Sequence, residues 1–310
     1  MKSKSSHNFG KFAAKKSNAA IKEQFKQEKR KVKKEREAYF DKKRQESAPQ
    51  HLRGTVKAPE TPPVHTRADE GLMPLNKYIA HAGICARRDA ADMVKKGLVK
   101  VNGETVTEPG HKVSSKDEVR VNGKKAFPVR NLFYILLNKP KDYITTTDDP
   151  KQRKTVLDLV GRATKERIFP VGRLDRNTSG VLLLTNDGEL AQKLTHPSNE
   201  VKKVYAVTLN RPLEKADFDK ILAGVTLDDG PASVDVLAYA DVKDKTQVGV
   251  EIHSGRNRIV RRIFEKVGYD VRGLDRVVFA GLTKKNVDRG KWRFLTEKEV
   301  RDLKHFGKGK

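Results

Sequence analysis

The side chains best able to do chemistry lie in a polar loop that precedes a short apolar run at residues 181–184. Asp175 stands in this loop between Arg173 and Arg176. Two neighbouring guanidinium groups favour the ionised form of the carboxyl group, and an ionised carboxylate can act as a nucleophile or as a general base. The residues alone leave a second interpretation open, because the same pattern occurs in solvated surface ion pairs that contribute little.

A second cluster of cations lies between residues 256 and 262. Apolar residues at helical spacing from residue 259 onward predict a helix there. A carboxylate that becomes buried needs a cation beside it, since an unpaired buried charge is very costly. Arg261 can meet that need for Asp175, whereas Arg256 and Arg258 are typical of a cationic surface that faces a polyanion.

The whole chain is strongly basic. Its 310 residues include 66 Lys and Arg against 40 Asp and Glu, which gives a formal net charge of +26 and a pI near 10.0. An excess of this size usually indicates a polyanionic partner, most often nucleic acid. The alternative is a basic protein that has no such partner.

Several other classes of site are excluded by the sequence. Cys85 is the single cysteine, so neither an intramolecular disulfide nor a thiolate zinc site can form. The eight histidines show no metal-ligand spacing, and the chain has neither a Gly-x-Gly-x-x-Gly dinucleotide loop nor a Gly-Lys-Ser/Thr phosphate loop. No apolar run could span a membrane, and residues 1–20 lack the apolar core of a secretory signal. We therefore expect a cytoplasmic protein without metal, cofactor or membrane contact.

Composition divides the chain into three segments. Residues 1–70 carry 19 Lys and Arg against 9 Asp and Glu, with few large apolar side chains, so they cannot bury enough surface to offset the entropy of ordering. We expect a disordered basic tail and linker that binds phosphates without reading sequence, with a merely solvated tail as the alternative. Residues 71–125 and 131–303 have the apolar periodicity of folded domains.

The segment 71–125 is predicted to form two short helices and a small sheet. Helical spacing covers residues 75–82 and 87–96. Strands flank Asn-Gly pairs at residues 102–103 and 122–123, which is the strongest hairpin signal in a sequence. This arrangement gathers cations on one face, where we expect contacts with the phosphates of a nucleic acid from Lys77, Arg87, Arg88 and Lys100.

Three stretches of this segment, residues 75–80, 87–90 and 97–103, resemble the small RNA-binding domain named after ribosomal protein S4. The resemblance implies a domain that grips structured RNA by its shape. Members often have Ser where this chain has Ala86, so we expect the second helix to begin with a weaker cap.

The larger segment, residues 131–303, mixes strands and helices without regular alternation. Apolar or alternating runs predict strands at residues 133–137, 181–184, 204–209 and 248–252, and helical spacing appears at 213–222 and 259–267. This order favours an α+β fold with a mainly antiparallel mixed sheet flanked by helices.

The stretch from Gly172 to Gly188, GRLDRNTSGVLLLTNDG, resembles the signature of bacterial ribosomal RNA pseudouridine synthases of the RsuA/RluB branch. Asn138-Lys139-Pro140, Lys203-Val204-Tyr205 and residues 255–262 resemble further motifs of that family in the same order. The resemblance covers roughly residues 71–300. It implies an isomerase that converts a uridine in structured ribosomal RNA to pseudouridine.

The resemblance also implies roles for individual residues. Asp175 would be the catalytic carboxylate, Tyr205 the ring that packs on the target base, and Arg261 the cation that pairs with Asp175. The further cations expected to contact RNA in this domain are Lys139, Arg173, Arg176, Arg256 and Arg258. Two positions depart from the family pattern, since Ile259 stands where Gln is common and Lys141-Asp142 where Gly is often found.

The chemistry of isomerisation agrees with these residues. Moving a base from its N1 to its C5 attachment needs neither a redox partner nor a group donor. The reacting atom is hidden in a stacked helix, so the base must be flipped out, and a flipped base needs a flat partner such as Tyr205. Two alternatives stay open: a non-catalytic RNA-binding or ribosome-assembly protein, and an RNA glycosylase that releases the base. We expect a monomer, and RNA of either ribosomal subunit as the substrate.

Overall fold

The computed structural model describes residues 71–129, 131–241 and 243–306. Residues 1–70, for which the sequence predicts a basic tail, lie outside this part of the chain. One hydrophobic core belongs to a small domain, and two further cores belong to the larger domain that follows it.

The small domain combines two helices with short strands. The helices are α2 (Leu75–His81) and α3 (Arg87–Lys95); the strands are β1 (Met73–Pro74), β2 (Val99–Val101), β3 (Glu104–Thr105), β4 (Lys112–Val113), β5 (Val119–Val121) and β6 (Lys124–Lys125). Four strands pair in the order β3-β2-β5-β6, while β1 pairs with β4. Both Asn-Gly pairs adopt positive φ, 51° and 93° at the first and 48° and 77° at the second, as tight hairpins require. Both predicted hairpins are confirmed, and Ala86, the residue before α3, provides no side-chain cap.

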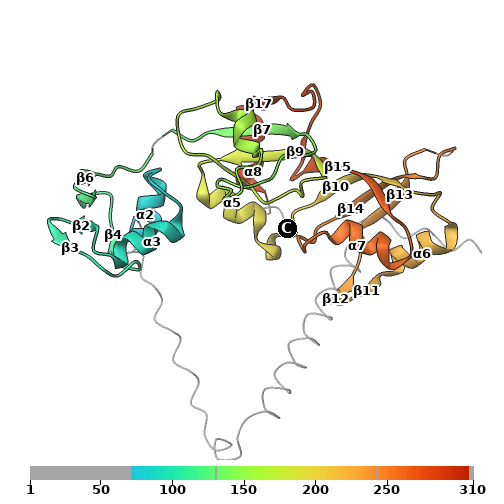
Figure 1. Ribbon diagram of the computed structural model, residues 1–310, viewed down its shortest axis with the longest axis horizontal. Helices are drawn as coiled ribbons and strands as arrows, with labels where there is room; N and C mark the ends of the chain where they lie inside the picture. Colours follow the sequence, from blue (N-terminus) through green and yellow to red (C-terminus); the bar gives the residue numbers. More distant parts are fainter. Residues whose placement is uncertain (1–70, 130, 242, 307–310) are drawn as a thin grey trace, which may run out of the picture. The chain divides into compact units, whose positions relative to one another are not determined.

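The larger domain is built on a nine-stranded sheet. Its strands are β7 (Tyr134–Lys139), β8 (Phe169–Pro170), β9 (Ser179–Thr185), β10 (Lys203–Leu209), β13 (Val236–Tyr239), β14 (Gln247–Ile252), β15 (Val271–Phe279), β16 (Leu282–Thr283) and β17 (Trp292–Phe294). The main path runs β13-β14-β10-β15-β9-β7-β17 (Figure 1), with β8 on β9 and β16 on β15. Every pairing is antiparallel except that of β9 with β15. The predicted α+β fold with a mainly antiparallel sheet is confirmed.

Helices and a small hairpin complete the domain. They are α4 (Val156–Val160), α5 (Gly188–Thr195), the 3-10 turn η3 (Pro197–Asn199), α6 (Lys215–Ala223), β11 (Val225–Leu227), β12 (Gly230–Ala232), α7 (Ile259–Lys266) and α8 (Glu297–His305). The helices α6 and α7 correspond to the two that apolar spacing predicted. Within the described residues, no helix has the length and apolar character needed to cross a membrane.

The central strands β7 and β9 are buried on both faces. Leu137 and Leu182 belong to one core, and Leu136 and Leu183 to the other. A strand covered on both faces needs apolar side chains at successive positions, which explains the unbroken run at the start of β9. β7 extends two residues further than predicted, through the polar pair Asn138 and Lys139, whose backbones pair with β9.

The parallel pairing brings the polar loop before β9 against β15. Ser179 and Gly180 pair with Asp275 and Arg276. Gly180 has a φ of 112°, and a β-carbon at this position would overlap the backbone nitrogen and oxygen of Arg276. Only glycine permits so close an approach. The loop that carries Asp175 therefore ends in the middle of the sheet.

Candidate active site

A cavity of about 300 Å³ opens where the loop before β9 meets β10, β15 and the segment before α7. This volume is at the lower end of the range for small-ligand pockets. Its charged or aromatic lining residues include Arg173, Asp175, Lys203, Tyr205, Arg256, Arg258 and Arg276. Four separate regions of the sequence thus contribute side chains to one cavity.

Asp175 reaches this cavity with its carboxylate unpaired. The residue is partly exposed, and no described residue donates a hydrogen bond to its side chain. Its backbone carbonyl, in contrast, accepts hydrogen bonds from the Thr178 N–H and from the Lys139 ammonium, both at 3.0 Å. The loop therefore fixes the backbone of Asp175 and leaves the carboxylate available to a substrate.

Lys139, the last residue of β7, binds the loop before β9 from within the protein and does not line the cavity. Its side chain is fully buried, and its ammonium donates to the carbonyl oxygens of Asp175 at 3.0 Å and Thr178 at 2.8 Å. Longer bonds reach the carbonyls of Arg176, in the same loop, and of the adjacent Pro140. Burial lowers the pKa of Lys139 to about 8, and the charge of Asp175 opposes this shift. A fully buried ammonium cannot contact RNA as the sequence predicted, so Lys139 organises the loop instead.

Arg261 lies on α7, with its guanidinium next to the same loop. Only 8% of the residue is exposed, and it donates to the carbonyl oxygens of Val271 at 2.7 Å and Asn177 at 3.2 Å. Burial lowers its pKa, while the charge of Asp175 acts in the opposite direction. In the described part of the chain the two side chains form no direct ion pair. The charge of Asp175 thus acts on Arg261, but the hydrogen bonds of Arg261 go to backbone carbonyls.

Tyr205 provides the aromatic wall of the cavity, with 9% of the residue exposed on β10. Two residues earlier, the Lys203 ammonium donates to the carbonyl oxygens of Val201 at 2.7 Å and His253 at 2.6 Å. Burial lowers the pKa of Lys203 to about 8, and the charge of Arg276 contributes to this shift. Lys203 therefore connects β10 to the segment before α7.

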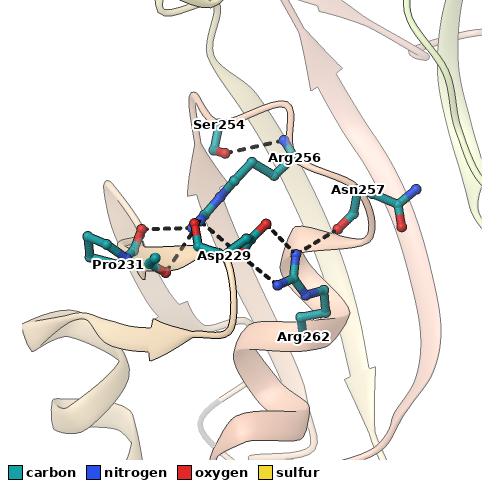
Figure 2. Close-up of polar contacts among 7 residues, drawn as sticks. Asp229, Pro231, Ser254, Arg256, Asn257 and Arg262 are labelled. Atoms are coloured by element: carbon teal, nitrogen blue, oxygen red, sulfur yellow. Dashed lines mark hydrogen bonds and ion pairs between the residues drawn. The ribbon is translucent and has the colours of Figure 1, made fainter.

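The segment before α7 is held by one carboxylate, as Figure 2 shows. Asp229, in the turn between β11 and β12, accepts hydrogen bonds from Arg262 at 2.6 and 2.9 Å and from Arg256 at 3.0 Å. Arg256 also donates to the Pro231 carbonyl at 2.8 Å. The hydrogen bonds from Arg262 hold the pKa of Asp229 below its usual value. The guanidinium of Arg256 is therefore engaged within the protein, although the sequence predicted it as an RNA contact.

The remaining predicted cations of this domain are exposed. Arg173 lies at the cavity wall, and no described residue forms a hydrogen bond or ion pair with it. Arg258 also lines the cavity and lies 3.6 Å from Glu265. Arg176 is not among the lining residues and pairs with Asp142 at 3.2 Å. Arg173 is thus the best placed of these three to bind a phosphate.

The predicted cations of the small domain lie on its helices and first long strand. Arg87 and Arg88 are exposed on α3, and Lys100 is exposed on β2. Lys77, on α2, is partly buried, and its ammonium pairs with Glu189 at 2.9 Å. The three exposed positions suit a surface that contacts phosphates, which stays a prediction.

Three residues of the site were not singled out from the sequence. Lys203 belongs to the same motif as Tyr205, but the motif gave it no role of its own. Arg276 is a charged residue at an inward-facing position of β15, and this break in the apolar pattern could have identified it. Asp229 precedes a glycine in an ordinary polar turn, so no sequence signal distinguishes it.

Comparison with known proteins identifies the family. A model described as RNA pseudouridylate synthase matches residues 133–266, and a model of the S4 domain matches residues 73–119. Ribosomal large subunit pseudouridine synthase B of Bacillus subtilis is 42% identical over 233 residues, which is 74% of this chain and 95% of that protein. Dual-specificity RNA pseudouridine synthase RluF of Escherichia coli is 35% identical, over 74% of this chain and 77% of that protein.

A solved structure agrees with these relatives. The crystal structure of a pseudouridylate synthase aligns with a TM-score of 0.54 and 29% identity, and the alignment covers 74% of this chain and 99% of the other. An unpaired carboxylate in a cationic cavity is in keeping with such an enzyme. The chain, an S4 domain followed by a catalytic domain, therefore belongs to the RNA pseudouridylate synthase family of isomerases.

Proposed function

We propose that the protein isomerises a specific uridine of ribosomal RNA to pseudouridine, with Asp175 as the catalytic carboxylate. The observation that carries the proposal is the Asp175 carboxylate itself, which lines the cavity beside Tyr205 without a hydrogen bond from any described residue. Ribosomal RNA is favoured because the Bacillus subtilis relative is named as a ribosomal large subunit enzyme.

The cavity suits a uridine that has left the RNA helix. Flipping a base out costs a few kcal/mol in lost stacking and pairing. The ring of Tyr205 offers a replacement stacking surface worth about 1–3 kcal/mol per base. Arg173, exposed at the cavity wall, is available to a phosphate of the flipped nucleotide.

The isomerisation exchanges one bond for another. The bond between C1′ and N1 breaks and its electron pair stays on the uracil, while Asp175 either attacks C1′ or takes a proton from the ribose. The uracil then turns and joins C1′ through C5. In this step the bond from Asp175 to C1′ breaks, or the proton that Asp175 took returns to the ribose; C5 loses its proton and N1 gains one. Lys139 and Arg261 bind carbonyls of the loop, which sets the direction of the Asp175 carboxylate and thereby supplies orientation.

The three segments divide the labour of RNA binding in this proposal. Residues 1–70 attract phosphates, residues 71–125 grip an RNA shape, and residues 131–303 act on the base, in a monomeric cytoplasmic enzyme. The logarithm of the RNA-binding constant falls linearly with the logarithm of the salt concentration. Deleting residues 1–70 should make this slope shallower by about 0.7–0.9 for each phosphate that the tail neutralises. It should leave the choice of uridine intact. Modification of a different uridine at an unchanged slope would contradict this division.

The substitution Asp175→Asn tests the catalytic assignment, because it keeps the shape of the side chain and removes its charge. We expect RNA binding to persist and pseudouridine formation to vanish, as mapped in ribosomal RNA from cells that carry each version. The control is Asp142→Asn, since Asp142 is an exposed carboxylate outside the cavity lining. Turnover by Asp175→Asn within about tenfold of the parent would reject the assignment.

RNA mass tests the type of reaction. Isomerisation leaves the mass unchanged, whereas an RNA glycosylase would remove the mass of the base. A protein that binds the RNA and changes neither its mass nor its pseudouridine content would be a non-catalytic binding protein.

A further inference from the structure

Arg276 is a buried guanidinium in the inner wall of the cavity. It is 2% exposed and pairs in register with Tyr205 across β15 and β10, so both side chains lie on one face of the sheet. Its Nε donates to the Val181 carbonyl at 2.8 Å, and its Cζ lies 4.5 Å from the ring centre of Phe279. These contacts fix the orientation of the guanidinium plane.

One terminal nitrogen of this guanidinium, Nη2, has no acceptor of its own. Nη2 is buried, and no described residue accepts a hydrogen bond from it. Burial lowers the pKa of Arg276, while the charge of the Tyr205 hydroxyl and a hydrogen bond with it oppose the shift. No described carboxylate forms an ion pair with Arg276. Buried donors and buried charges are almost always paired in folded proteins. An acceptor that arrives with the substrate would complete this site.

We propose that Arg276 binds a carbonyl oxygen of the target uracil and stabilises the negative charge on the ring after it detaches from the ribose. This inference rests on the proposed function and adds a catalytic residue to it. When the bond between C1′ and N1 breaks, the electron pair spreads over N1 and the two carbonyl oxygens. When C5 bonds to C1′, the ring gives up that charge. A fixed cation in a site with little water stabilises charge of this kind most effectively.

The position of Arg276 favours the base over a phosphate. Its neighbour in the cavity wall is Tyr205, the proposed stacking partner of the ring. Exposed cations suited to phosphate, Arg173 and Arg258, line the same cavity. A phosphate contact would therefore use the exposed residues and leave Arg276 to the uracil.

The first test compares Arg276→Lys with Arg276→Gln. Single-turnover rates with excess enzyme should fall by about 10²–10³-fold in Arg276→Gln, the effect of removing one charge-stabilising donor, and less in Arg276→Lys. RNA affinity should stay within about threefold, because phosphate contacts dominate it. The control is Arg293→Gln, since Arg293 pairs with Glu299 at 2.6 Å and does not line the cavity; it should keep the parent rate.

Two results of this test would overturn the proposal. One is a folded Arg276→Gln protein that reacts within about threefold of the parent rate. The other is a loss of RNA affinity with an unchanged rate at saturation, which would indicate a phosphate contact.

The second test leaves the protein unchanged, so it does not depend on the folding of the variants. Sulfur accepts hydrogen bonds poorly, so RNA with 2-thiouridine or 4-thiouridine at the target position should react more slowly when the contacted oxygen is replaced. We expect one of the two to lose at least about tenfold in rate with the parent protein, and less with Arg276→Gln. If neither thiouridine slows the parent, Arg276 makes no such contact. A parent that forms no pseudouridine in unmodified RNA would instead reject the proposed function.

Discussion

Replacing Lys139 by Met should lower the rate by about 10²-fold while the domain stays folded. The shift of its pKa from 10.5 to about 8 corresponds to about 3 kcal/mol of unfavourable burial at about 1.4 kcal/mol per unit, which Met relieves. The variant also lacks the bonds to the carbonyls of Asp175 and Thr178, and each bond from a charged donor contributes about 1.5–3 kcal/mol. The net loss of about 0–3 kcal/mol is smaller than the stability of a typical domain, about 5–15 kcal/mol.

Activity should respond more strongly than stability because the damage is local to the loop. A displacement of about 1 Å at a reacting group can cost about 10²-fold in rate. The assay is the single-turnover rate of pseudouridine formation, measured beside urea unfolding. Lys141→Met is the control, since Lys141 is exposed two residues away. A Lys139→Met protein that keeps its unfolding midpoint and reacts within about threefold of the parent would refute this role.

The same group predicts a pH dependence. Below about pH 8 the ammonium is charged in both states and its burial penalty is fully present; between about 8 and 10.5 the folded protein has released the proton that the unfolded chain keeps. Its contribution to stability therefore rises with pH across that window. The rate should instead fall above about pH 8, because the neutral amine has one donor fewer for the loop. Arginine keeps its charge above pH 8, so Lys139→Arg should remove this fall in rate. If the fall persists in that variant, the titrating group is Lys203, whose pKa is also lowered to about 8.

The remaining predictions concern the cavity walls. Tyr205→Phe should keep most of the single-turnover rate, while Tyr205→Leu should lose stacking worth about 1–3 kcal/mol; equal rates would exclude stacking. Asp229→Asn should loosen the segment before α7 and lower the rate without weakening RNA binding, whereas Asp228→Asn, an exposed neighbour, should match the parent. An equal loss in both would indicate a general effect of charge. Gly180→Ala should lower the thermal midpoint, because the new β-carbon overlaps the backbone of β15; an unchanged midpoint would show that the strand can shift.

Local patterns predicted much of the fold. Asn-Gly pairs specified both hairpins of the small domain, because the turn needs residues that accept positive φ. Helical spacing located α6 and α7, and the unbroken apolar run located β9. These features depend on neighbouring residues, so the sequence carries them directly.

The site was predictable only in part. The loop signature pointed to Asp175, and the structure gives that residue a place in a cavity. The burial of Lys139 depends on the packing of β7 against a loop some 36 residues away in the sequence. The spacing of neighbouring residues therefore does not predict it. The engagement of Arg256 by Asp229 likewise joins residues 27 apart. A cationic side chain that the sequence suggests as an RNA contact can therefore be occupied by hydrogen bonds within the protein.

The parallel pairing of β9 with β15 also determines when the site can exist during synthesis. Ser179 and Asp275 touch across 96 residues of sequence. Ribosomes add about 5–20 residues per second, so the catalytic loop waits about 5–20 s for its partner strand to emerge. During that interval β9 presents an open edge, which is a hazard for misassembly. A nascent chain that ends before Arg276 cannot close the cavity, so the enzyme becomes competent only when translation of its catalytic domain is nearly complete.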